Sequence, residues 1–190
     1  MTLLRSRSLS VALPLALSLV GASCNEPLAP PEPGAVLFEV EYVNGAWMPT
    51  WNGFVVEADG KVFSYNLDGA SLVPADDDHF TAAELEAKYA HHRKLVRAVS
   101  ASEAATMYAR VGDALAGTVT PPQGVCADAG ITRYSALLYD ESTGTYRRLL
   151  LHQRGDEART NTSPAARELY QWLIDVTSTG AGAGVCDPNA

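Results

Sequence analysis

The stretch that decides the fold is Gly53–Asn66, GFVVEADGKVFSYN. Its two apolar runs flank Asp59-Gly60, and that dipeptide is among the strongest short-range signals for a β-hairpin. A two-residue loop at Asp59-Gly60 sets the register and places four large side chains of the two strands on one face. The predicted pairs are Ala58 with Lys61, Val56 with Phe63, and Phe54 with Tyr65.

Three more segments predict strands around this hairpin. Residues 35–43, AVLFEVEYV, alternate in side-chain type, so Phe38 and Val40 share one face while Glu39 and Glu41 share the other. This pattern predicts a half-buried strand. Two further strands are predicted at 132–140 and 145–152, joined by a turn over 141–144.

Helix signals separate the strands into two groups. Thr81 and Glu84 form a capping box ahead of a stripe at helical spacing, which predicts a helix over 81–99. A second helix is predicted over 101–116, and Ser163 followed by Pro164 predicts the start of a third. The order of elements predicts the α+β class, with an antiparallel sheet built from hairpins and about three helices packed on one face. The apolar stripe that predicts the helix over 81–99 consists of Leu85, Tyr89, His92, Val96 and Val99.

The N-terminus has the pattern of an export signal. Two arginines precede an apolar run over 9–20, which is shorter than the roughly 20 residues of a membrane span. The next residues, Gly21-Ala22-Ser23-Cys24, resemble the lipobox of bacterial lipoproteins, with Gly21 where that family usually has leucine. The resemblance implies cleavage before Cys24, lipidation of its sulfur, and a membrane anchor in the bacterial envelope facing the periplasm or the exterior. A plain exported protein cut after Ala22 is the alternative.

Cysteines and composition divide the rest of the chain. Lipidation of Cys24 leaves Cys126 and Cys186 as an even pair, which predicts a disulfide in an oxidising compartment. We expect a signal peptide over 1–23, a proline-rich tether over 24–34, and one domain over 35–177. Residues 178–190 form a Gly/Ala-rich tail, which the disulfide would hold to the domain.

The charge of the chain excludes one class of partner. Its formal net charge is −8, and removal of the signal takes away two arginines and no acid, which gives −10. Such a chain has no basic stripe for nucleic acid. The excess of acid keeps the protein soluble.

Few residues carry signals of chemistry. The acidic run Asp76–His79 could hold a divalent cation, but neighbours in a run do not converge, and a solvated loop before a helix is the simpler reading. Adjacent His91 and His92 point about 100° apart on a helix, so we expect no metal site, and His92 is predicted to be a core histidine. No G-x-S-x-G or phosphate-binding loop occurs, so no cofactor is expected.

Aromatic residues give the most suggestive remaining pattern. Trp47 and Trp51 flank a short predicted loop, WMPTW. Tryptophans in a loop can form a recognition surface, and they can equally plug one end of a small sheet. Both interpretations stay open at this point.

The order of strands and helices, with GFVVEADGK early and a strand pair leading into a capped helix, is similar in outline to emfourin-type inhibitor domains of metallopeptidases. This resemblance implies a non-enzymatic domain that binds an envelope protein or peptide. An exported hydrolase that uses Asp76–His79 or His152 is one alternative, and a purely structural envelope protein is another.

Overall fold

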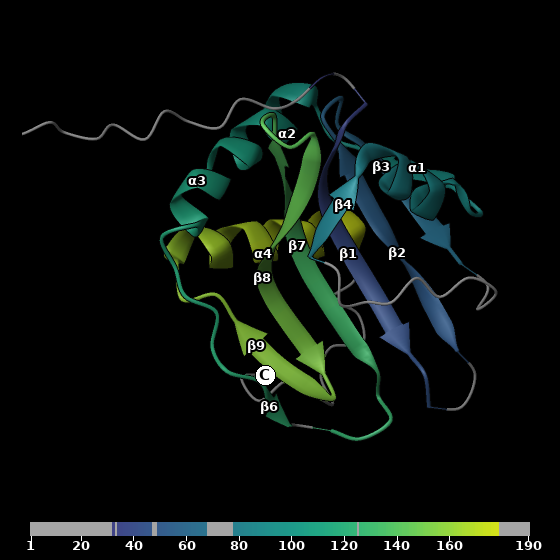
Figure 1. The fold of residues 1–190 in the computed structure, drawn as a ribbon, viewed down its shortest axis with the longest axis vertical. Coiled ribbons are helices and arrows are strands. Elements are labelled where there is room, and N and C mark those ends of the chain that lie inside the picture. The colour runs from purple at the N-terminus through teal and green to yellow at the C-terminus, as the bar shows by residue number, and fades with distance from the viewer. Residues whose placement is uncertain (1–31, 33, 47–48, 68–77, 125, 179–190) are drawn as a thin grey trace, which may run out of the picture.

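The computed structural model describes residue 32 and residues 34–46, 49–67, 78–124 and 126–178 (Figure 1). Strands and helices alternate in groups along this part of the chain. The strands are β1 (Val36–Asn44), β2 (Thr50–Glu57), β3 (Lys61–Asn66), β4 (His79–Thr81), β5 (Lys94–Ala98), β6 (Gln123–Gly124), β7 (Ile131–Asp140), β8 (Thr145–Gly155) and β9 (Glu157–Thr160). The helices are α1 (Ala82–Ala90), α2 (Ala101–Ala109), α3 (Val111–Ala114) and α4 (Pro164–Thr177).

The strands form one antiparallel sheet in the order β5-β3-β2-β1-β7-β8-β9-β6. The short strand β4 lies off this path and pairs with the start of β8. The predicted α+β class, with an antiparallel sheet and packed helices, is confirmed. β1 lies at the centre of the sheet, between β2 and β7, so any side chain on β1 is far from an edge.

Helices cover both faces of the sheet, whereas one covered face was expected. A large apolar core lies between the sheet and the helices α2, α3 and α4, with Phe38, Leu169 and Leu173 among its buried members. A smaller core lies under α1 on the opposite face and includes Leu85 and Tyr89. Figure 1 shows α1 on the near side of the sheet and α4 behind it. The expectation therefore holds for α2, α3 and α4 and is wrong for α1.

The hairpin forms at the predicted place, but its register is shifted by one residue. Val56 pairs with Val62, and Val55 pairs with Phe63. The loop has three residues because Gly60 adopts a positive φ of 83°, and its N–H donates to the carbonyl oxygen of Glu57 at 2.9 Å. Hairpin loops of this length use a glycine in the left-handed region. A one-residue slip exchanges the two faces of a strand, so Tyr65 and Val55 face α1 while Phe54 and Val56 face the large core.

β1 is buried on both faces, although its alternation predicted a half-buried strand. The alternation itself is correct from Phe38 onward, since Phe38 and Val40 belong to the large core. A bulge between Val36 and Phe38 shifts Val36 to the α1 side. On that side Glu39 and Glu41 are each 1 % exposed, because α1 covers them.

The predicted helix over 81–99 ends early. Its N-terminus is correct, since Thr81 and Glu84 form the reciprocal capping box. The helix stops at Ala90, and His92 takes a positive φ of 48° before the chain enters β5, which pairs with β3. His92 and Val96 are consequently exposed, and neither belongs to the core. Pairing of β5 with β3 at the edge of the sheet overrode the helical spacing of Val96 and Val99, and the β-branched Val96 also suits a strand.

The second half of the domain agrees more closely with the sequence. Strands β7 and β8 and the start of α4 at Ser163-Pro164 lie as predicted, and the Ser163 hydroxyl accepts from the N–H of Ala165 at 3.2 Å. The predicted helix over 101–116 is divided at Arg110 into α2 and α3. The short strands β4, β6 and β9 were not predicted, because two to four residues carry no readable periodicity.

We expect Leu169→Ala, in the middle of the buried face of α4, to lower the free energy of unfolding by about 2–5 kcal/mol, since it removes buried methyl groups and leaves a cavity. Leu115→Ala is the matched control, because Leu115 is 41 % exposed, and its effect should stay within about 0.5 kcal/mol. Denaturant unfolding followed by circular dichroism measures both. Equal effects of the two substitutions would contradict the described packing of α4.

Candidate functional site

Five charged side chains meet under α1 and form what we name the buried ion cluster: Glu39, Glu41, Lys88, Arg133 and Arg148. Lys88 of α1 places its Nζ 2.6 Å from Oε1 of Glu39 and 2.6 Å from Oε1 of Glu41. Arg148 of β8 places its Nη2 3.0 Å from Oε2 of Glu39, and Arg133 of β7 places its Nη1 3.3 Å from Oε2 of Glu41. The cluster therefore joins α1, β1, β7 and β8.

Aromatic residues of β2, β3, β4 and α1 enclose the cluster. The Tyr65 hydroxyl donates to Oε1 of Glu39 at 2.8 Å, and the Trp51 indole N–H donates to Oε1 of Glu41 at 2.8 Å. The Nζ of Lys88 also lies 5.4 to 5.8 Å from the centres of four aromatic rings, so cation–π attraction adds to its ion pairs. These rings belong to Trp51, Tyr65, Phe80 and Tyr89.

Electrostatic interactions fix the protonation states in and around the buried ion cluster. Burial by itself would raise the pKa of Glu39, but the positive charges of Lys88 and Arg148 together outweigh burial and lower that pKa from 4.5 to about 2. Burial, followed by the charge of Glu39, raises the pKa of Tyr65 and of Tyr89 well above the usual value. The charges of Glu39 and Glu41 raise the pKa of Arg148 against the opposing effect of burial. At neutral pH Glu39 and Arg148 therefore stay charged and Tyr65 and Tyr89 stay neutral, which suits a structural scaffold better than proton transfer.

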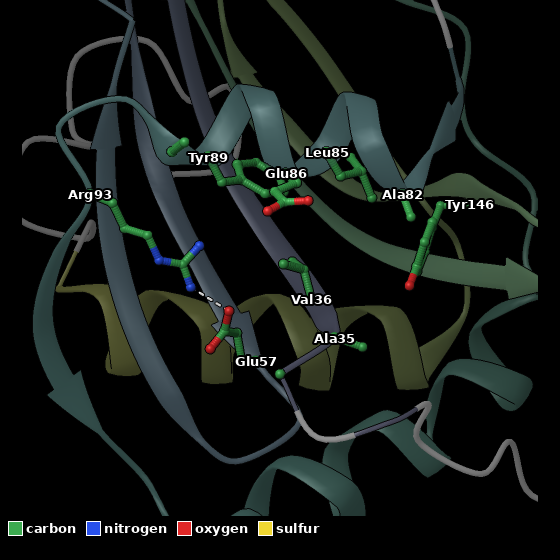
Figure 2. A pocket seen from close by; sticks show the side chains of 11 residues that line it. Ala35, Val36, Glu57, Ala82, Leu85, Glu86, Tyr89, Arg93 and Tyr146 are labelled. Carbon is green, nitrogen blue, oxygen red and sulfur yellow. Dashed lines mark hydrogen bonds and ion pairs between the residues drawn. The ribbon is translucent and has the colours of Figure 1, made fainter.

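A cleft opens above the cluster between α1 and the start of β1, and we name it the α1 cleft (Figure 2). Its volume is about 470 Å³, within the range of small-ligand and side-chain pockets. Ala82, Glu86 and Ala90 lie one turn apart along α1 and form one wall, and Val36 lies opposite. The floor and the remaining walls are mostly apolar.

Charged and aromatic groups close the two ends of the α1 cleft. Figure 2 shows Arg93 paired with Glu57 at one end and the ring of Tyr146 at the other. Glu86 is exposed on the rim, whereas Glu57 is occupied by Arg93. The cleft can therefore take an apolar group and offers one carboxylate beside it. Tyr89 connects it to the buried ion cluster, because its ring lines the cleft while the charge of Glu39 acts on its hydroxyl.

Trp51 does not form the binding surface that was one of its two interpretations. It is 3 % exposed and its N–H bonds to Glu41, so it seals the sheet. Trp47, Cys24 and Cys186 lie outside the described residues. Cys126 lies half-buried in the loop before β7, and its pairing with Cys186 stays a prediction.

The residues of the hypothetical hydrolase are not brought together. His79 is exposed on β4, which pairs with residues 145–147 of β8. His152 lies five residues further along β8, roughly 16 Å at 3.3 Å per residue, and stacks on Tyr170 of α4 with ring centres 4.1 Å apart. Asp76 and Asp77 lie outside the described residues. Within the described ranges no three or more His, Cys, Asp and Glu side chains gather as metal ligands would.

Sequence reasoning missed the buried ion cluster. Glu39 and Glu41 alternate with apolar residues, which is also the pattern of a strand with one solvated face. Lys88 falls in an exposed-looking stretch of a short helix. The available signal was the apolar pair Leu85 and Tyr89, which requires α1 to cover some face of the sheet.

Comparison of this chain with known proteins found no similar protein. No protein-family profile, curated protein or solved structure matches this chain. The likenesses to bacterial lipoproteins and to emfourin-type inhibitor domains therefore stay predictions from the sequence. Among the described residues, no helix has the length and apolar character needed to cross a membrane.

We expect Lys88→Met to lower the free energy of unfolding at neutral pH by about 3–5 kcal/mol, because it leaves two buried carboxylates short of a cation. Because the folded-state pKa of Glu39 is depressed, its stabilising effect is complete above pH 4.5 and is lost as the pH falls towards 2. The difference in the free energy of unfolding between the wild-type protein and the variant should therefore become smaller as the pH falls from 4.5 to 2. Urea unfolding at several pH values measures it.

Lys61→Met provides the matched control. Lys61 forms an ion pair with Asp59 on the surface of the hairpin, where its side chain is 51 % exposed. Solvent screens such a pair, so the substitution should change stability little and with no comparable pH dependence. A gap for Lys88→Met that stays constant from pH 7 to pH 2 would show that Glu39 does not depend on Lys88.

Proposed function

We propose that this protein is a lipoprotein of the bacterial envelope, anchored through Cys24, whose domain binds a protein partner without catalysing a reaction. The lipobox-like segment and the proline-rich tether over 24–34 support the anchor. Pairing of Cys126 with Cys186 would fix the tail in the oxidising environment outside the cytoplasm. The domain would then stand off the membrane, with the α1 cleft beside the point where the tether enters β1.

The α1 cleft is the observation that carries the binding function. It is mostly apolar and open, and of the two glutamates among its described lining residues Glu57 is paired with Arg93, whereas Glu86 is exposed on the rim. The chain as a whole carries a net charge of −8, so a positively charged partner approaches it more readily than a negatively charged one. We therefore assign to the cleft an extended peptide segment that inserts one apolar side chain and presents a Lys or Arg to Glu86.

A binding function fits the chemistry of the site better than the hydrolase alternative. The ionised side chains beneath the cleft hold one another in fixed states, and Glu39 has its pKa lowered to about 2 rather than raised towards neutrality. A general acid or base needs a pKa near the operating pH. The ion pairs of Lys88 instead hold α1 in place over the sheet, and a preformed binding cleft requires walls that are fixed in this way.

The peptide assignment is tested by selecting binders from a random peptide library with the purified protein. We expect the selected peptides to combine an apolar residue with a neighbouring Lys or Arg. Ala82→Gln, which fills the cleft, and Glu86→Gln, which removes the rim charge, should each weaken their binding by about tenfold, or roughly 1.4 kcal/mol.

Ala87→Gln is the matched control, since Ala87 is exposed on α1 and does not line the cleft. Its peptide affinity should equal that of the wild-type protein. Peptides without a basic residue, or an equal loss of affinity in Ala87→Gln, would place the binding surface elsewhere.

The anchor is tested separately by replacing Cys24 with alanine in a bacterial host. We expect the variant to stay unprocessed or to appear in the soluble fraction, because no sulfur remains to carry the diacylglycerol. Fractionation and mass spectrometry of the N-terminus measure both outcomes. Normal cleavage and membrane partitioning of the variant would refute the lipoprotein assignment while leaving the cleft untouched.

A further inference from the structure

The strand β5 is exposed along its whole length. It lies at one end of the sheet, where β3 pairs with its inner edge, and among the described residues no strand pairs with its outer edge. Every residue of the strand is exposed, and the apolar Leu95 and Val96 are 52 % and 47 % exposed. The outward N–H and C=O groups of such an edge are a template on which another chain can add a strand.

Positive charge gathers on one face of β5. Arg97 lies opposite Val62, a member of the large core, and its Nη1 donates to the carbonyl oxygen of Asp175 on α4 at 2.9 Å. Lys94 lies opposite Ser64, which is two residues after Val62 on β3. Because residues two apart on a strand share a face, and so do residues directly opposite each other, both cations lie on the face that α4 covers.

The other face of β5 is apolar. Leu95 lies opposite Phe63, which packs against the smaller core on the α1 side. Val96 is the extra residue of a bulge, which is why Lys94 and Arg97 share a face although they are three residues apart. A strand added at this edge would therefore meet cations on one face and an apolar side chain on the other.

Charge decides which strand fits this edge. Neither Lys94 nor Arg97 forms an ion pair with a described carboxylate. A second copy of β5 would bring its own cations to the same face, and like charges opposite one another destabilise a sheet. The cations therefore protect the edge against self-pairing and at the same time attract a strand that carries acidic side chains.

We propose that β5 binds an extended segment of a partner protein, in which acidic and apolar residues alternate, and which adds a strand to the sheet. The acidic side chains face Lys94 and Arg97, and the apolar side chains cover Leu95. Main-chain hydrogen bonds supply the affinity and the alternate side chains supply the specificity, as in other cases of strand addition. This edge is separate from the α1 cleft, and its binding does not depend on the peptide assigned there.

Fluorescence anisotropy with short labelled peptides tests the proposal on the purified protein. We expect saturable binding of a peptide in which Glu and Val alternate, at least tenfold tighter than that of the matched peptide in which Gln and Val alternate. Bound peptide should also slow the hydrogen exchange of backbone amides in β5. N-methylation of every second residue of the acidic peptide removes the main-chain donors along one edge and should abolish binding.

The double variant Lys94→Glu/Arg97→Glu should bind the acidic peptide about tenfold more weakly or worse, because repulsion replaces attraction at both positions. Arg147→Glu/Arg167→Glu is the matched control, since it changes the net charge equally at exposed positions of β8 and α4 that lie away from β5. Its affinity should equal that of the wild-type protein. Both double variants should keep the wild-type circular dichroism spectrum.

Three outcomes would overturn the proposal. The first is that the acidic peptide shows no saturable binding, or binds as tightly after N-methylation. The second is an equal loss of affinity in the two double variants. The third is self-association of the wild-type protein through β5 in sedimentation velocity, which would assign the edge to a second copy of this chain.

Discussion

The structure depends on the compensation of two carboxylates buried at the centre of the sheet. Glu39 and Glu41 lie on β1 and are almost fully removed from water. Carboxylates in that position are tolerated only when cations and hydrogen-bond donors surround them. Those partners come from α1, β7 and β8, up to 109 residues away in the chain, so the charges can be neutralised only when these elements are assembled.

This constraint also positions the α1 cleft. Lys88 and Tyr89 are neighbours on α1, so the helix that neutralises the glutamates also presents one wall of the α1 cleft. Arg148 connects the same cluster to β8 through its ion pair with Glu39. The buried ion cluster thus fixes the position of α1 over the sheet, and with it one wall of the cleft. Several charge-assisted bonds keep this wall in place without a ligand.

Local sequence signals correctly predicted those element boundaries that depend only on neighbouring residues. The capping box at Thr81 and the Ser163-Pro164 start of α4 satisfy their own backbone donors, so the chain forms them without distant help. The Asp59-Gly60 turn was located correctly, but its loop length was not, because a glycine in the left-handed region suits two-residue and three-residue loops alike. The predicted helix over 81–99 was too long because Val96 continues the helical spacing and also suits a strand, and only pairing with β3 decided between the two.

The sequence by itself determined the fold class, the central strands and the helix starts. These depend on side-chain periodicity, caps and composition, which act over a few residues. Only the tertiary structure decided that α1 lies on the opposite face from α4, that Trp51 is buried, and that β1 carries its charges inside. Alternation shows that a strand has two unlike faces, but it does not show whether the polar face meets water or ions. That choice depends on Lys88 and Arg148, whose place beside β1 is set by long-range packing.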